Sequence, residues 1–413
     1  MNQRNNRPET GETVPGLAPR RAALRLMDAV LRRGETLDNA AHAATQGLPQ
    51  NDKALARALA GEAMRWMVDL DALIDSATRQ ILPDDAKPRS VLRLMLAGWL
   101  RLETPPHAVV ATGLELLQGG PRRLAHGVFS ALVKQGAQLP DAPTLPEGVA
   151  QRWGERGAAI AAGLTVPPPL DLSIKPGGAA PEGLSLMPGH VRLSRGDAVE
   201  SLPGFADGDW WVQDLAASIP ARLIGAGTGR VLDVCAAPGG KTMQLAAAGW
   251  QVTALDSSPK RIERMRANLA RTGLSADLLA VDALKYQPEE LFDAVLLDAP
   301  CSATGTCRRH PDVLHRIGPR QIAEMAELQE ALLARAAGWL KPGGVLVYAV
   351  CSLEREEGEE QAVKVGLTPD PIRAAELPEG LSPTGEGWLR TDPGMLAEVG
   401  GLDGFFVARW RRG

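Results

Sequence analysis

The second half of this chain alternates short apolar segments with longer amphipathic ones, and this alternation restricts the fold more than any other feature of the sequence. Helical periodicity fills residues 260–271 and 321–340. Apolar strands that alternate with helices form a parallel sheet with helices on both faces. The sequence therefore predicts a doubly wound, mostly parallel α/β domain over residues 208–413. Its strands are expected at residues 231–234, 252–255, 277–281, 294–297 and 345–350.

A turn of small residues follows the first of these strands. The stretch Val231-Leu-Asp-Val-Cys-Ala-Ala-Pro-Gly-Gly-Lys-Thr242 reads as a strand that breaks into a helix, which presents backbone N–H groups and a helix N-terminus to a ligand. A P-loop needs glycine five positions before Gly240, where Cys235 stands, and the G-x-G-x-x-G spacing of dinucleotide sites is absent. The stretch is therefore a Rossmann-like loop for a smaller adenosine ligand, and we expect a methyl donor.

Acidic residues end the next three strands. Asp256, Asp282 and Asp298 each follow an apolar segment, and ligands of such sheets bind beyond the carboxyl ends of the strands. Asp256 is expected to accept ribose hydroxyls and Asp282 an adenine amino group. Helix capping and a simple turn are the structural alternatives for these two residues. Three acids that all meet one loop favour the ligand interpretation.

Two cysteines follow the last two predicted strands. Cys301 comes after the fourth strand and Cys351 after the fifth, so both thiols are expected near one pocket. Cys235 and Cys307 are interpreted as small core residues or as residues placed by their backbone. A zinc site on Cys301, Cys307 and His310 would lack a second close pair of ligands, so no metal site is predicted.

A thiolate beside a methyl donor suits methylation of a pyrimidine at carbon 5. That carbon is a weak nucleophile until a thiolate adds to C6. Carbon 5 then takes the methyl group from the donor, a base removes the C5 proton, and the thiolate leaves. The thiol needs a pKa lowered from about 8.5 by nearby positive charge. Lys241, Arg308 and Arg309 are the candidate cations. The target base must leave any stack to react. The residues alone do not decide which thiol attacks.

The first third of the chain has helical periodicity throughout. Residues 20–138 are predicted to form an all-α domain, with one long apolar face from Leu55 to Ile81 and breaks at prolines. Arginine on helix faces suits phosphate contacts, although a solvated face or a scaffold is the alternative. The arginines assigned to exposed positions are Arg20, Arg21, Arg25, Arg32, Arg33, Arg89, Arg93, Arg101, Arg122 and Arg123.

The remaining segments are less regular. Residues 139–207 are rich in proline and glycine, and they predict a small α+β linker subdomain with strands near 166–174 and 191–193. Residues 1–19 are polar without an apolar core, which predicts a disordered tail rather than a secretory signal. No apolar run is long enough to span a membrane. Four cysteines in one half of the chain indicate free thiols and a cytoplasmic location.

Several motifs resemble a known family. The stretches Asp233–Thr242, Asp298-Ala-Pro-Cys-Ser-Ala-Thr-Gly305, Arg308-Arg-His-Pro-Asp312 and Tyr348-Ala-Val-Cys-Ser352 resemble the Fmu/Sun family of RNA cytosine-C5 methyltransferases. Arg20-Arg-Ala-Ala-Leu-Arg-Leu-Met-Asp-Ala-Val30 resembles the opening helix of the NusB-like RNA-binding domain. Val350 departs from the family, which has threonine there, and Ser173-Ile-Lys175 replaces the usual Arg-Val-Asn.

The resemblance implies methylation of carbon 5 of a cytosine in 16S ribosomal RNA, with S-adenosyl-L-methionine as cofactor and small-subunit RNA outside the mature subunit as partner. It also implies that Cys351 is the nucleophile and that Cys301 assists product release. A transfer-RNA C5 methyltransferase and a non-catalytic NusB-like assembly factor are the alternatives. The implied cofactor contacts are Cys235, Ala236, Ala237, Pro238, Gly239, Gly240, Lys241, Asp256, Asp282 and Asp298, and Asp298 also touches the base.

Overall fold

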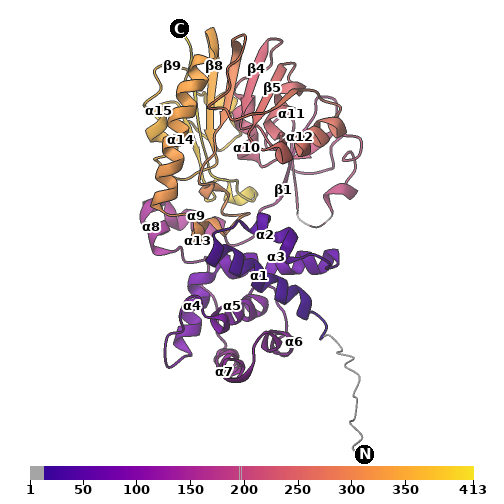
Figure 1. The fold of residues 1–413 in the computed structure, drawn as a ribbon, viewed down its shortest axis with the longest axis vertical. Helices are drawn as coiled ribbons and strands as arrows, with labels where there is room; N and C mark the ends of the chain where they lie inside the picture. The colour runs from indigo at the N-terminus through magenta and orange to yellow at the C-terminus, as the bar shows by residue number, and fades with distance from the viewer. Residues whose placement is uncertain (1–13, 195, 197) are drawn as a thin grey trace, which may run out of the picture. The chain divides into compact units, whose positions relative to one another are not determined.

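The computed structural model describes residues 14–194, 196 and 198–413 (Figure 1). Contacts divide them into two units, which are described separately. The first unit runs to Pro146 and also includes His310–Arg316, and the second comprises Glu147–Arg309 and Ile317–Gly413. In the part of the chain that the structure describes, no helix has the length and apolar character needed to cross a membrane.

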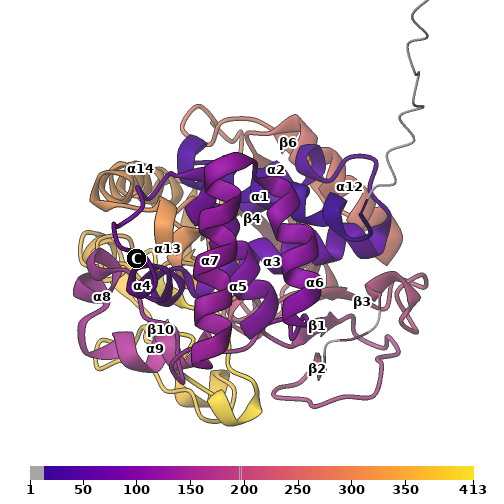
Figure 2. The same ribbon diagram turned by 90° about the horizontal axis from the view of Figure 1, so that it is seen from below.

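The first unit is helical, as predicted (Figure 2). Thr36 is the N-cap of α2, and its hydroxyl accepts a hydrogen bond from the Asn39 backbone N–H. Pro88 and Pro106 lie in the first turns of α5 and α6, where a missing N–H costs nothing. The helices are α1 Leu17–Arg33, α2 Leu37–Ala44, α3 Gln50–Arg65, α4 Met67–Ser76, α5 Lys87–Leu100, α6 Pro106–Gly113, α7 Gly119–Gln135 and the short α13 Val313–Arg316.

The long apolar face predicted from Leu55 to Ile81 is wrong at its far end. The helix is interrupted at Trp66, whose backbone angles (φ −105°, ψ 16°) separate α3 from α4. Leu59 and Leu70 are buried on either side of this break, but α4 ends at Ser76 and Ile81 is 75% exposed. The periodicity extended past the point where the chain turns toward Pro83.

Two of the arginines predicted to be exposed are buried instead. Arg89 and Arg93 lie on α5 with 2% of their surface exposed. Arg93 makes two 2.7 Å hydrogen bonds to Asp71, and Arg89 binds Asp75 at 2.7 and 2.9 Å. These bidentate pairs join α5 to α4, so the two guanidinium groups serve packing of the helices rather than a surface.

Most of the predicted disordered tail, residues 1–13, lies outside the described residues. The prediction is wrong for its last residues, because α1 begins at Leu17, directly after Gly16 in a left-handed conformation (φ 79°). Leu17 is buried against the helical core, which gives the chain a reason to become helical before Arg20.

The region between the two predicted domains contains two short helices and a small antiparallel sheet. The helices are α8 Glu147–Trp153 and α9 Gly157–Gly163, and the strands are β1 Leu170–Ile174, β2 His190–Leu193 and β3 Trp210–Val212 in the order β2-β1-β3. The domain boundary predicted after residue 207 would separate β3 from β1, the strand with which β3 pairs. Trp210 is fully buried and its indole N–H donates to the Pro203 carbonyl, which keeps β3 with this small sheet.

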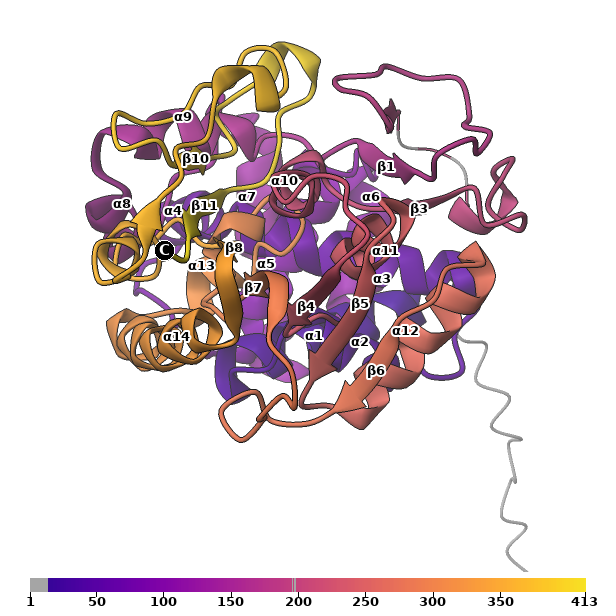
Figure 3. The ribbon, with the colours of Figure 1, turned by 90° about the horizontal axis from the view of Figure 1, so that it is seen from above.

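The large sheet of the second unit has eight strands, and its backbone follows the order β10-β11-β8-β7-β4-β5-β6 (Figure 3). All five predicted strands are present and mutually parallel, which confirms the doubly wound prediction. The sequence did not predict β11, which pairs antiparallel with β8. The strands are β4 Arg230–Val234, β5 Gln251–Asp256, β6 Asp277–Ala280, β7 Phe292–Asp298, β8 Leu340–Val350, β9 Thr368–Pro369, β10 Leu389–Thr391 and β11 Phe405–Arg411.

Helices cover both faces of this sheet. Met243 of α11 and Ile262 of α12 pack with one apolar cluster, and Leu332 and Leu333 of α14 pack with the other. Successive residues of a strand point to opposite faces, so neighbouring residues Val231 and Leu232 belong to different clusters. The helices of the second unit are α10 Leu215–Arg222, α11 Gly240–Ala247, α12 Pro259–Thr272, α14 Pro319–Gly338 and α15 Glu359–Ala362.

Candidate active site

The loop after β4 has a backbone that few residues can adopt. Cys235 lies in the left-handed region (φ 62°), and Gly239 has φ 102° at the N-cap of α11. A Cβ on Gly239 would lie 2.6 Å from the Met265 side chain, so this position needs glycine. The turn brings the first backbone N–H groups of α11 to the carboxyl edge of the sheet, where they have no partner within the helix.

Asp256 ties this loop to the next strand. Its carboxylate accepts hydrogen bonds from the backbone N–H groups of Ala237 (3.3 Å) and Ser258 (3.0 Å), and Arg261 lies 3.1 Å away. The N-cap of α12 is Ser258 itself, whose hydroxyl accepts from the Arg261 backbone N–H. Asp256 therefore contacts the loop, whereas capping of the helix falls to its neighbour.

Asp282 has the environment of a turn residue. It follows β6 and its carboxylate accepts a hydrogen bond from the Leu284 backbone N–H at 3.0 Å. The side chain is about half exposed, at 47%. This is the turn arrangement that the sequence left as an alternative, and the role of Asp282 toward an adenine stays a prediction.

A buried ion pair links the loop to the fourth predicted strand. The ammonium group of Lys241, in the first turn of α11, lies 2.8 Å from the carboxylate of Asp298 at the end of β7. Burial acts to lower the pKa of Lys241, but the charge of Asp298 and its hydrogen bond outweigh burial, and the pKa is raised above its usual value. Lys241 is therefore a fixed positive charge at this edge.

The two thiols meet beside this pair. The Sγ atoms of Cys301 and Cys351 lie 3.5 Å apart, because β7 and β8 are adjacent, parallel and in register at Asp298 and Ala349. This confirms that the thiols lie together. The hydrogen bond with Cys351 is the largest cause that raises the pKa of Cys301 well above its usual value, and burial is the second. Cys301 is therefore the thiol that keeps its proton.

Two of the three candidate cations interact electrostatically with Cys351. The charge of Cys351 contributes to raising the pKa of both Lys241 and Arg309. Burial acts to lower the pKa of Arg309, and the charges of Asp403 and Asp214 more than offset it. Arg308 instead donates a 2.7 Å hydrogen bond to the Gly400 carbonyl.

The other cysteines are not placed for nucleophilic chemistry. Cys307 is fully buried, which confirms its interpretation as a core residue. Burial, together with the charges of Asp298 and Asp256, raises the pKa of Cys235 to about 12, so that its thiol stays neutral. Among the described residues, no group of three histidine, cysteine or acidic side chains is arranged to hold a metal ion.

Sequence reasoning missed one buried residue at this edge, Glu357. Its carboxylate is fully buried and accepts hydrogen bonds from Ser302 and Ser352, the residues that directly follow the two thiols. Glu357 belongs to an acidic run, Glu354-Arg-Glu-Glu357, in which its exposed neighbour Glu356 has the same side chain. No sequence signal separates the two glutamates.

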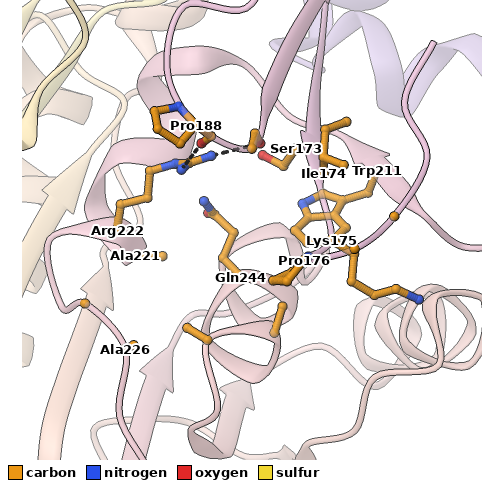
Figure 4. Close-up of a pocket in the computed structure, with 16 residues that line it drawn as sticks. Ser173, Ile174, Lys175, Pro176, Pro188, Trp211, Ala221, Arg222, Ala226 and Gln244 are labelled. Atoms are coloured by element: carbon orange, nitrogen blue, oxygen red, sulfur yellow. Dashed lines mark hydrogen bonds between the residues drawn. The ribbon is translucent and has the colours of Figure 1, made fainter.

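A cavity of about 590 Å³ opens elsewhere in the second unit, between the end of β1, the end of α10 and α11 (Figure 4). Gln244 points into it and Arg222 turns to the carbonyls of Pro188 and Gly189, at 2.7 and 3.0 Å. Gln244 donates to the Ser218 carbonyl. The polar side chains of Arg222 and Gln244 are thus hydrogen-bonded within the protein. The predicted site residues that the structure describes do not line this cavity.

Two family models match the chain. The model described as 16S rRNA methyltransferase RsmB/F matches residues 224–411, and that of the NusB family matches residues 17–121. The chain is 34% identical to the ribosomal RNA small subunit methyltransferase B of Klebsiella pneumoniae, over 94% of this chain and 97% of that protein. This chain belongs to the RsmB/F family. The resemblance to Fmu/Sun-type enzymes and the NusB domain is thereby confirmed.

Solved structures agree on the architecture. The structure titled PH0851 matches 96% of this RsmB/F-family chain and 99% of its own with a TM-score of 0.71, and at 21% identity it shows the fold alone. A methyltransferase homologue from Pyrococcus horikoshii is 26% identical, with a TM-score of 0.52 over 64% of this chain and 93% of its own. The cofactor of this RsmB/F-family chain is S-adenosyl-L-methionine.

Proposed function

We propose that this protein methylates carbon 5 of a cytosine in 16S ribosomal RNA through a covalent bond between Cys351 and C6 of the base. The observation that carries the proposal is the 3.5 Å approach of Cys301 and Cys351 at the carboxyl edge, beside the Lys241–Asp298 pair. Few reactions need two thiols and a fixed cation next to a methyl donor. Methylation at a pyrimidine carbon does, because the carbon must first be made nucleophilic.

The residues at the edge fit the cofactor. Gly239 leaves no Cβ where the loop passes Met265, and the backbone N–H groups at the start of α11 face the end of the strand. Asp256 ends the next parallel strand and holds the loop at Ala237. The loop residues Cys235 to Lys241 together with Asp256, Asp282 and Asp298 would hold S-adenosylmethionine, which supplies an electrophilic methyl group.

The surroundings of the two thiols support Cys351 as the nucleophile. Cys301 keeps its proton and hydrogen-bonds to Cys351, and Lys241 and Arg309 add positive charge around the Cys351 sulfur. A thiol that keeps its proton suits Cys301 for proton donation, and the cations near Cys351 suit an attacking sulfur. The residues alone left the order of the thiols open, and the raised pKa of Cys301 together with the cations near Cys351 supports attack by Cys351.

Each thiol then has a separate task. The Cys351 thiolate forms a bond to C6, which places electron density on C5 for methyl transfer. After a base takes the C5 proton, the electrons of the C5–H bond restore the ring double bond and the carbon–sulfur bond breaks. Cys301 lies close enough to Cys351 to exchange a proton with the departing sulfur. A thiol in this place assists release rather than attack.

The choice of RNA is supported by the family rather than by the site. The Klebsiella pneumoniae relative is named for the small ribosomal subunit, and the family model for the NusB family covers residues 17–121. We propose that the helical domain, residues 20–138, binds small-subunit RNA before it becomes part of the mature subunit. A transfer-RNA substrate remains the alternative within the same chemistry.

The test uses two cysteine variants with a tritiated donor. Purified Cys351→Ala and Cys301→Ala are incubated with 16S ribosomal RNA or transfer RNA, and methylated cytosines are located by bisulfite sequencing. We expect no product from Cys351→Ala and a persistent protein–RNA adduct from Cys301→Ala. Full methylation by Cys351→Ala would contradict the mechanism. Methylation of transfer RNA alone would contradict the substrate, and labelling of neither RNA by the wild type would favour the assembly-factor alternative.

A further inference from the structure

Glu357 is a charged side chain in a place where charge is costly. It lies in the segment that follows Cys351 and is fully buried, whereas its neighbour Glu356 is exposed. Burial raises the pKa of Glu357 above its usual value, and hydrogen bonds from Ser302 and Ser352 oppose that rise. A buried carboxyl group survives in a folded protein only when its hydrogen bonds compensate for lost hydration.

The partners of this carboxylate come from the two segments that carry the thiols. One oxygen accepts from the Ser302 backbone N–H at 2.8 Å and from the Gln329 amide at 3.3 Å. The other oxygen accepts from the hydroxyls of both Ser302 and Ser352. Ser302 follows Cys301 directly, and Ser352 follows Cys351 directly. One side chain therefore binds the residue next to each sulfur.

The backbone of Glu357 is itself held to the sheet. The hydroxyl of Tyr348, on β8, donates to the backbone carbonyl of Glu357 at 2.5 Å. Thr304 adds a link, because its hydroxyl accepts from the Leu353 backbone N–H at 3.0 Å. The chain beyond β7 and the chain beyond β8 are thus joined where the strand ladder no longer fixes them.

We propose that Glu357 is the positioning residue that fixes Cys301 and Cys351 at their reactive separation, by binding the exit segments of both strands at once. The inference rests on the proposed function for its catalytic meaning, but the geometry can be tested without it. Hydrogen bonds to a carboxylate are shorter and stronger than those between neutral groups, so one carboxylate can hold two short segments in one register. Glu357 touches neither sulfur in the contacts above and positions both through its serines. Its charge also contributes to raising the pKa of Cys301, so loss of that charge acts to speed oxidation, whereas loss of positioning slows it.

The first test measures the thiol pair directly by oxidation of the full-length protein with diamide. The two thiols lose two electrons and two protons and form an S–S bond, and diamide is reduced to the corresponding hydrazine. Peptide mapping follows formation of the Cys301–Cys351 disulfide. We expect Glu357→Ala to slow this step at least ~10-fold, because the thiols lose their effective concentration. The control is Glu356→Ala, which removes an exposed carboxylate one residue away.

The second test separates positioning from general stability. With RNA containing 5-fluorocytosine, whose fluorine blocks release, the single-turnover rate of adduct formation is measured at saturating S-adenosylmethionine. We expect ~100-fold slower adduct formation in Glu357→Ala with unchanged cofactor affinity, since small misplacements have effects of this size. Glu357→Gln keeps one side-chain oxygen that accepts from the Ser302 backbone N–H. Its amide NH₂ group can donate to the hydroxyl oxygens of Ser302 and Ser352, so this variant should recover most of the rate.

The outcomes are distinct. A Glu357→Ala protein that forms the disulfide and the adduct at wild-type rates overturns the proposal. If Glu357→Ala does not fold, Ser352→Ala replaces it: it removes only the Cys351 side of the arrangement, and a wild-type disulfide rate in that variant overturns the proposal equally. Failure of the proposed function would appear instead as methylation by Cys351→Ala, and it would leave the diamide measurement readable.

Discussion

Two regions of this molecule bury charge, and they use it differently. In the helical unit, Arg89 and Arg93 are each paired with one carboxylate through two hydrogen bonds, and the pairs join α5 to α4. At the carboxyl edge of the large sheet, Lys241 also interacts with the charge of Cys351, and Glu357 binds the segments that carry both thiols. Burial alone therefore does not identify a site. What distinguishes the second region is that its charges act on reactive groups.

The largest expected effect comes from removing the fixed cation at the sheet edge. Lys241→Met should slow adduct formation with 5-fluorocytosine RNA by ~10²- to 10³-fold, because the Cys351 thiolate loses positive charge nearby. The matched control is Lys260→Met, the same change at an exposed lysine on α12. Equal rates in the two variants would remove Lys241 from the mechanism.

A change in the helical unit should reverse this pattern. Arg93→Met removes two hydrogen bonds from Asp71, which is partly exposed and keeps Arg89 3.6 Å away, so the loss of unfolding free energy should be about 2 kcal/mol. Urea denaturation of the protein measures this loss. The diamide rate of Cys301 and Cys351 in the folded variant should stay at the wild-type value. Slower formation of the Cys301–Cys351 disulfide under native conditions would show that the ion pairs of the helical unit also influence the thiols.

Asp233 provides a pH test of the sheet edge. Burial, opposed by the hydrogen bond with Thr242, raises its pKa to about 7. Because the folded pKa exceeds the unfolded value of about 4, the contribution of Asp233 to stability is full below pH ~4 and is lost as pH rises toward ~7. Asp233→Asn should flatten the decline of unfolding free energy over this window.

Some of that decline should survive in Asp233→Asn. Burial and the charge of Asp403 also raise the pKa of Asp214 to about 7, so this second carboxyl acts in the same direction. Chemical denaturation at a series of pH values measures both slopes. An unchanged slope in Asp233→Asn would show that its carboxyl does not bind the extra proton.

The smallest effect is expected at a surface pair. Arg320 and Glu324 lie one turn apart on α14 with their charged groups in water, 2.8 Å from each other. Arg320→Ala should leave both the thermal midpoint and the methylation rate unchanged, because solvent screens such pairs. A clear loss in either measurement would show that proximity of charges matters here even without burial.

The sequence predicted the elements that depend on local pattern. Apolar strands before Asp256, Asp298 and Cys351 indicated parallel pairing, and parallel strands bring their carboxyl ends to one edge whatever the details of packing. The proximity of Cys301 and Cys351 followed from this rule, since each comes after one of two neighbouring strands. The family motifs extended these expectations to the cofactor.

Tertiary structure decided the properties that depend on which side chains from other segments contact a residue. Periodicity carried the apolar face on to Ile81, and composition placed Arg89 at a surface, because neither shows where a helix ends or which carboxylates a neighbouring helix presents. Glu356 and Glu357 are chemically identical and adjacent, but only Glu357 is buried against the serines that follow the two thiols. The loop from Val231 to Thr242 and the positions of the five parallel strands along the chain follow from local pattern, which a sequence can determine. The raised pKa of Cys301 and the partners of Glu357 depend on contacts between segments distant in the chain, and those contacts exist only once the sheet has formed.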